Sequence, residues 1–141
     1  MPTRREQILS RITTILAATS GVSGRVYRSR VEPIIRGQSP AVVVEPVSDQ
    51  AEQTTLATLD WSLTVRVTVF TRGAIPDQLA DPVVASVYDL IMQDTTLNGY
   101  AIDVLPLGTN FEMIEADQAA GVVECDFSIR YRTPLNTLTV V

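Results

Sequence analysis

The sequence has 141 residues, 45% of them hydrophobic and 19% charged, a composition typical of one folded domain and too apolar for a disordered chain. No stretch approaches the roughly 18 apolar residues of a membrane span, and Ser and Thr interrupt the segment after MPTRREQ too often for a signal peptide. Cys125 is the single cysteine, so no internal disulfide can form. We therefore expect one domain that stays in the reducing cytoplasm where it is made.

Charge is distributed unevenly along the chain. All 11 basic residues are arginine, histidine is absent, and the net charge is −5. Up to Arg36, seven arginines accompany two acids, whereas from Gly37 onward four arginines accompany 14 acids. A basic front and an acidic remainder favour contact between copies of the chain, front to back. The alternative is that the arginines only solubilise a helix and a loop.

The first expected element is a helix over residues 4–19. Thr3 and Glu6 match a capping box, and Gly21 suits the left-handed position that ends a helix. Apolar residues recur at helical spacing and form one stripe, which consists of Ile8, Leu9, Ile12, Ile15 and Leu16.

Two short strands are expected next, at residues 25–31 and 41–46. The segment between them contains two prolines and a glycine, which predicts a loop. Pro46 is expected to end the second strand. The polar segment at residues 47–53 then forms the tip of a hairpin.

The central strand is predicted over residues 56–70. Within Leu59–Thr71 apolar and polar residues alternate strictly, so one face must be covered while the other can meet water or a partner. Such a strand would span on the order of 50 Å, well beyond the ~5–6 residues of a typical strand. We expect an arm that projects beyond the sheet, a bend at a bulge, or a break near Ala57.

The second half is expected to hold one helix and three strands. The helix is predicted over residues 77–93, with Pro82 near its start. Strands follow at residues 101–107, 111–115 and 122–133, with a turn between the first two. A tail without packing partners of its own completes the chain at residues 134–141.

This order of elements predicts an α+β fold with two layers. A mostly antiparallel or mixed sheet carries both helices on one face, because the central strand has a single apolar face. The residues expected in the core between the layers are Ile8, Ile12, Leu16, Trp61, Leu63, Val65, Val67, Val87, Leu90, Ile91, Phe127 and Ile129.

The residue types argue against catalysis. Without histidine the chain lacks the commonest catalytic base and transition-metal ligand, and without lysine it lacks a Walker phosphate loop and Schiff-base chemistry. Glu124 and Asp126 share a strand face with Arg130 and Arg132, which fits either a carboxylate site or a solvated, ion-paired sheet face. We expect no cofactor and no metal ion.

Nucleic acid is a further candidate partner. Tyr27 lies among four arginines that could contact phosphates, namely Arg25, Arg28, Arg30 and Arg36. The acidic net charge opposes independent binding to DNA, and no segment has the pattern of a recognition helix. We therefore expect no sequence-specific binding to nucleic acid.

Several short motifs follow one another in a characteristic order. They are an R-x-Y-x-x-R segment with a loop proline (Arg25, Tyr27, Arg30, Pro33), a short strand ending at Pro46, the Trp61 strand, the helix DPVVASVYDLIMQD followed by TLNG, and a closing Arg130-Tyr131-Arg132-Thr133. In this order and spacing, residues 4–134 resemble the small tail terminator proteins of tailed bacteriophages, the lambda-type minor tail protein group.

The resemblance implies a structural function without catalysis. Such proteins form a ring, commonly a hexamer, on the last ring of a growing tail tube, where they stop polymerisation and give the head connector a docking surface. The implied partners are further copies of the chain, the tail tube protein and a head-side connector, within a virion assembled in the host cytoplasm. The residues expected at subunit or ring contacts are Arg25, Arg28, Arg30, Arg36, Ser48, Asp49, Gln50 and Glu52.

Two other functions remain open at this point. One is a head–tail joining or neck completion protein of the same kind of virion. The other is a small carboxylate-dependent enzyme, which would use Glu124 and Asp126.

Overall fold

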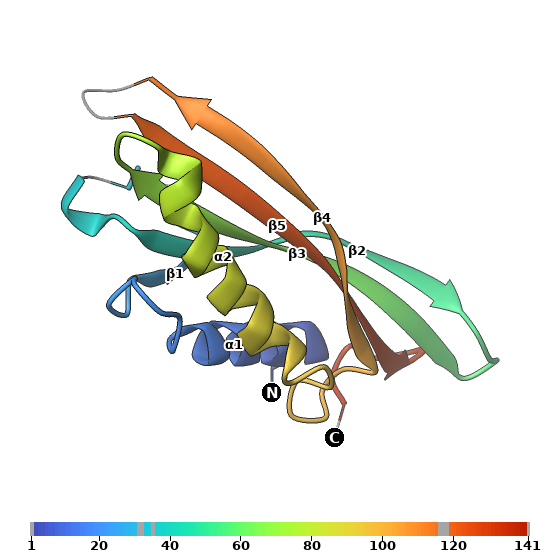
Figure 1. The fold of residues 1–141 in the computed structure, drawn as a ribbon. Coiled ribbons are helices and arrows are strands. Elements are labelled where there is room, and N and C mark those ends of the chain that lie inside the picture. The colour runs from blue at the N-terminus through green and yellow to red at the C-terminus, as the bar shows by residue number, and fades with distance from the viewer. Residues whose placement is uncertain (1, 31–32, 35, 116–118, 141) are drawn as a thin grey trace.

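The computed structural model describes residues 2–30, 33–34, 36–115 and 119–140. It consists of a long curved sheet with both helices packed on one face (Figure 1), which confirms the predicted two-layer α+β fold. The elements in chain order are α1 (Arg4–Leu16), β1 (Val26–Arg28), the 3-10 helix η1 (Arg36–Gln38), β2 (Ala41–Gln53), β3 (Thr58–Arg72), α2 (Pro76–Met92), β4 (Asp103–Ile114) and β5 (Ala120–Pro134).

The described sheet is mixed, with the strand order β1-β2-β3-β5-β4. Strand β1 pairs with β2 in parallel, and the other three pairings are antiparallel. The predicted central strand is β3, which lies between β2 and β5 along its whole length. Strand β4 forms one outer edge, and beyond the short β1 the outer edge of β2 forms the other.

Helix α1 begins as its capping box predicts but ends a turn early. The Thr3 hydroxyl accepts a hydrogen bond from the Glu6 backbone N–H at 3.2 Å. The helix ends at Leu16 rather than at residue 19, because the backbone N–H and the hydroxyl of Thr19 both donate to the Leu16 carbonyl, at 2.9 and 2.6 Å. A threonine side chain that bonds to nearby backbone in this way competes with the helical pattern.

Four of the predicted strands need correction. Strand β1 covers only Val26–Arg28 of the predicted 25–31, because Ser29 adopts a positive φ of 50°. Strand β2 does not end at Pro46 but continues to Gln53, with a bulge between Pro46 and Ser48. A proline and a bulge are tolerated there because this part of β2 is a sheet edge.

The two strands predicted at residues 101–107 and 111–115 form one strand, β4, from Asp103 to Ile114. The glycine that was expected to make a turn, Gly108, lies instead at a bulge beside Pro106. The central strand has no break near Ala57. Strand β3 begins at Thr58, and Ala57 belongs to the four-residue turn that joins β2 to β3.

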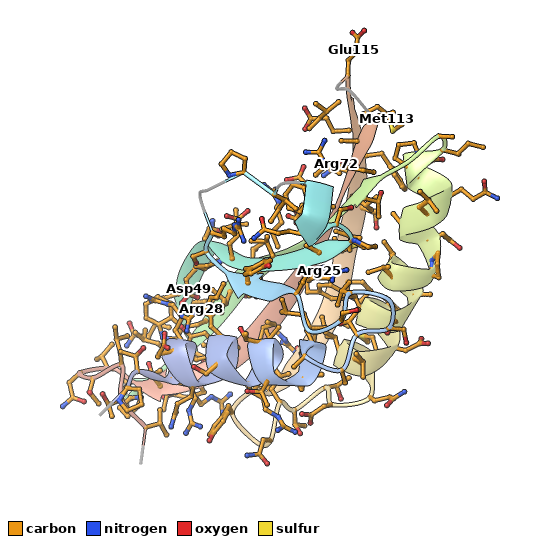
Figure 2. All side chains as sticks on the ribbon, turned by 90° about the vertical axis from the view of Figure 1, so that its left-hand side faces the viewer. Arg25, Arg28, Asp49, Arg72, Met113 and Glu115 are labelled. Carbon is orange, nitrogen blue, oxygen red and sulfur yellow. The ribbon has the colours of Figure 1, made fainter. Side chains whose placement is uncertain are left out.

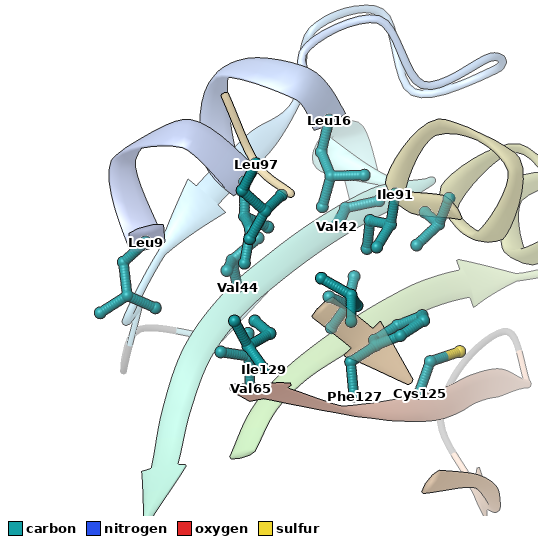
Figure 3. Packing of buried hydrophobic residues seen from close by; sticks show 14 of the residues in the cluster. Leu9, Leu16, Val42, Val44, Val65, Ile91, Leu97, Cys125, Phe127 and Ile129 are labelled. Carbon is teal, nitrogen blue, oxygen red and sulfur yellow. The ribbon is translucent and has the colours of Figure 1, made fainter. Parts of the chain in front are cut away.

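The core lies between the helices and the sheet (Figure 3) and gathers side chains from both helices and from β2, β3 and β5. Ten of the twelve predicted core residues are among its buried members, and each large side chain contributes roughly 1.5–3 kcal/mol. The other two, Trp61 and Leu90, are only partly buried and pack against the core from its margin. Trp61 is covered in part by the Arg5 guanidinium of α1, which lies 6.0 Å from the centre of its ring.

The opposite face of the sheet is not bare along its whole length. A second, small cluster forms there from buried Ile34, Ala41 and Val43, with partly buried Tyr27 and Phe70 packed against it. The loop between β1 and β2 therefore covers one end of the face that lacks helices.

The two ends of the described chain meet beside α1 (Figure 1). The Arg4 backbone N–H donates to the Leu138 carbonyl at 3.0 Å, so the segment after β5 folds back to the start of the first helix.

Candidate functional site: surfaces for assembly

The β2–β3 hairpin projects at one end of the sheet (Figure 1) as an arm, which we define as residues 48–60. Its turn is held by Thr55, whose hydroxyl accepts the backbone N–H groups of Ala57 and Thr58 at 3.2 and 3.0 Å. The turn presents Leu56, whose side chain is 92% exposed. An ordered turn with an exposed leucine is a suitable contact element, because little conformational freedom remains to be lost on binding.

The arm is attached to α1 through Asp49. Its carboxylate accepts hydrogen bonds from the Arg5 guanidinium at 2.7 Å and from the Tyr131 hydroxyl. Trp61 stacks on Tyr131 with ring centroids 6.1 Å apart. Burial, together with the adjacent Asp49 carboxylate, raises the pKa of the Tyr131 hydroxyl. This arrangement fixes the base of the arm, so Asp49 has an internal role that its sequence position did not reveal.

The other predicted arm residues lie on the opposite side of β2. Ser48, Gln50 and Glu52 are exposed and pair in register with Thr64, Ser62 and Asp60, on the face without helices. They form a polar surface that is free to meet another protein. Their proposed interface role stays a prediction.

Three of the four arginines predicted for contacts are engaged within the described part of the chain. Arg28 forms a two-pronged ion pair with Glu6 at 2.5 and 2.6 Å, which holds the pKa of the Glu6 carboxyl below its usual range. Arg25 donates to the Pro40 carbonyl at 2.9 Å, and Arg30 donates to the Gln38 side chain at 2.8 Å. The side chain of Arg36 lies outside the described residues. The basic front of the sequence is thus partly neutralised in the fold, as Figure 2 shows for Arg28 beside α1.

The carboxylates considered for catalysis belong to ion pairs on the face without helices. Arg66 lies 3.0 Å from Asp126 and 3.3 Å from Glu124. The pairs of Arg130 with Asp103 and of Arg132 with Asp60 extend the series along the sheet. Among the described residues no group of acids, cysteine or histidine is arranged to hold a metal ion. These carboxylates therefore belong to a solvated sheet face on which ion pairs link neighbouring strands.

The surface that sequence reasoning missed is the edge strand β4. Five apolar side chains along it are between 44% and 69% exposed, and these are Leu105, Leu107, Phe111, Met113 and Ile114. They project to both sides of an edge whose backbone groups are unpaired, as the register to β5 requires. The signal was present in the sequence: DVLPLGTNFEMI has apolar residues at odd and even positions, yet no lysine or arginine protects it.

Neither described helix combines the length and the apolar character that crossing a lipid bilayer requires. The helices instead bury one side each against the sheet.

Comparison with known proteins gives a structural likeness. No family model and no curated protein matches the sequence. The fold is similar to that of a chain in a solved structure described as "Virion of native gene transfer agent (GTA) particle", with a TM-score of 0.58 and 16% identity. The match covers 93% of this chain and 92% of the other. At this identity the likeness is one of fold, and it extends over nearly the whole of both chains.

Proposed function

We propose that this protein is a structural component of a phage-like virion, and specifically a tail terminator. In this role it forms a ring, commonly of six copies, on the end of the tail tube, stops tube polymerisation and presents a docking surface to the head connector. The observation that carries the proposal is the shared fold with a chain of a gene transfer agent virion over 93% of the sequence. The order of sequence motifs over residues 4–134 supports it independently.

The surfaces of the chain suit a ring. Head-to-tail association needs two different surfaces on opposite sides of one subunit. The outer edge of β4 and the free edge of the β2 arm lie on opposite sides of the sheet. The apolar residues of β4 are of the kind that a soluble protein covers with a partner.

A structural rather than enzymatic role agrees with the chemistry. The acids of the uncovered face are held by Arg66, Arg130 and Arg132. The chain has no histidine to act as a base near neutral pH. Its partners in the virion are then further copies of itself, the tail tube protein and a head-side connector.

Deletion of the gene tests the proposal by electron microscopy of lysates. We expect overlong tails, or tails without heads, and a plasmid copy of the gene should restore normal length. Tails of normal length that still join to heads would contradict a terminator role.

A head–tail joining protein of the same neck region is the second candidate, since the shared fold applies to it equally. In that case the deletion would produce filled heads beside separate tails of correct length. Tail length therefore separates the two roles in a single experiment.

A further inference from the structure

An apolar pocket of about 180 Å³ lies on the sheet face without helices, at the end opposite the arm. Loop residues Pro33 and Ile34 form one wall, and Phe70, Ile114 and Val122 from β3, β4 and β5 form the others. An engineered protein cavity of about 150 Å³ binds benzene. The pocket is therefore large enough for a branched aliphatic side chain, which would displace poorly bonded water.

The arm carries a side chain of this kind. Leu56 stands at the tip of the β2–β3 turn with 92% of its surface exposed. The hydroxyls of Thr55 and Thr58 lie 2.7 Å apart within the turn, and the Leu135 backbone N–H donates to the Ala57 carbonyl at 2.9 Å. These bonds hold the leucine outward in a defined position, although water gives it no favourable contact.

Leu56 cannot reach the pocket of its own chain. The start of β3, at Thr58, pairs with Pro134, while Phe70 in the pocket wall pairs with Val122 at the other end of the same strand pair. Twelve residues of extended strand separate Thr58 from Phe70, on the order of 40 Å. The tip and the pocket can therefore meet only between two molecules.

The charged side chains near the two places include one pair of opposite sign, Arg72 and Glu52. Arg72 lines the pocket and donates to the Ile34 carbonyl at 3.0 Å (Figure 2 labels Arg72 at this end). The sequence from Gly37 to Val65, which includes the whole arm, contains acids but no arginine or lysine. Glu52 is exposed near the tip, on the same face of the sheet as the pocket.

We propose that Leu56 of one copy occupies the pocket of the next copy, with Glu52 near Arg72. The contact joins two different surfaces, so it repeats from copy to copy and closes a ring if the rotation permits. This inference rests on the proposed ring and names the contact that builds it. The partner is a second copy because one chain carries both halves at opposite ends.

Two variants and their mixture test the contact by sedimentation over a range of concentrations. Leu56→Asp removes the apolar tip, and Ala120→Phe fills the pocket from its β5 wall. We expect each variant to associate at least about tenfold more weakly than the wild-type chain, as the loss of an anchor side chain implies. An equimolar mixture should form dimers and nothing larger, because only one intact tip–pocket pair remains. Leu79→Asp, which changes another exposed leucine, should associate as the wild type does.

Disulfide formation tests the same contact without relying on the pocket variant to fold. A mixture of Leu56→Cys and Ala120→Cys should give a mixed dimer under mild oxidation, whereas Leu79→Cys with Ala120→Cys should not. The native Cys125 is buried and does not compete.

The outcomes separate this inference from the proposed ring. Rings of Leu56→Asp as stable as wild-type rings would overturn the tip–pocket contact and leave the ring in place. A wild-type chain that stays monomeric, together with no mixed disulfide, would overturn both.

Discussion

The two long hairpins of this fold expose surfaces of different polarity to water. The β2–β3 arm is polar on its uncovered face, and hydrogen bonds of Thr55 and Asp49 fix its turn and its base. The β4–β5 hairpin ends in an edge strand with exposed Phe111, Met113 and Ile114 (Figure 2 labels Met113 and Glu115 at this end). The arm exposes one large apolar side chain, Leu56 at its tip, whereas the β4 edge exposes several side by side.

This difference indicates which surface needs a partner more. The uncovered face of the arm is polar, so apart from Leu56 at the tip its exposure to water costs little free energy. Exposed apolar residues on an unpaired edge invite association with any available strand. We infer that the β4 edge has the stronger tendency to associate with another chain and that the polar face of the arm has the weaker one.

The largest expected effect is a difference in stability between a substitution at the centre of the sheet and one at its edge. Ile129→Ala removes a fully buried side chain from β5 and should cost about 2–5 kcal/mol. Phe111→Ala removes a larger side chain that is 69% exposed, and the isolated subunit should change by no more than about 0.5 kcal/mol. Denaturant unfolding of the monomer measures both. Equal losses would mean that β4 is covered in the monomer.

The next effect concerns the base of the arm. Arg5→Met leaves the Asp49 carboxylate, whose side chain is only 9% exposed, without its ion pair, and we expect a loss of about 1–3 kcal/mol. The matched control is Arg28→Met, which breaks the exposed pair with Glu6 and should cost at most about 1 kcal/mol. If thermal unfolding shows equal shifts for the two variants, Asp49 does not anchor the arm.

A smaller effect appears in the dependence of stability on pH. Arg28, Arg132 and Arg130 hold the pKa values of Glu6, Asp60 and Asp103 below their usual range. Because these folded-state pKa values are depressed, the stabilisation is present above the unfolded values near pH 4 and is lost as pH falls through the folded ones.

Urea unfolding between pH 7 and pH 2 measures this dependence. We expect a plateau above about pH 5 and a decline below about pH 4. Arg130→Gln with Arg132→Gln should make the decline shallower. An unchanged slope in that double variant would show that solvent screens the pairs fully.

The smallest expected effect is on the reactivity of one thiol. Burial raises the pKa of the Cys125 thiol, so little of the nucleophilic thiolate forms at pH 8. A thiol-specific chromogenic reagent should react slowly with the native protein and fully after denaturation. Fast reaction in the native state would indicate that the contact between β5 and α2 opens around Cys125.

The sequence predicted the architecture because its periodic patterns are local. The alternation of Leu63, Val65 and Val67 and the stripe of Ile8 and Ile12 each reflect one face that must be buried. Bulges were not predictable in the same way. Pro46 and Gly108 each predicted the end of a strand, but position at a sheet edge lets the strand continue through a bulge.

The candidate contacts were predicted less well, because tertiary neighbours decide them. Asp49 resembled an exposed hairpin residue until Arg5 and Tyr131 were brought beside it. Arg130 and Arg132 share a strand face with Glu124 and Asp126, but they bond to Asp103 and Asp60 on the flanking strands. Neither partner is close in sequence.

The hydrogen bond between the Arg4 N–H and the Leu138 carbonyl has a practical consequence for labelling. An affinity tag or fluorescent reporter fused to either terminus would emerge at the same corner of the molecule, beside α1. A pair of fluorophores placed at the two termini would therefore report on the integrity of this corner. The same closeness makes a circular permutant feasible, with a short linker across the corner and new ends opened elsewhere.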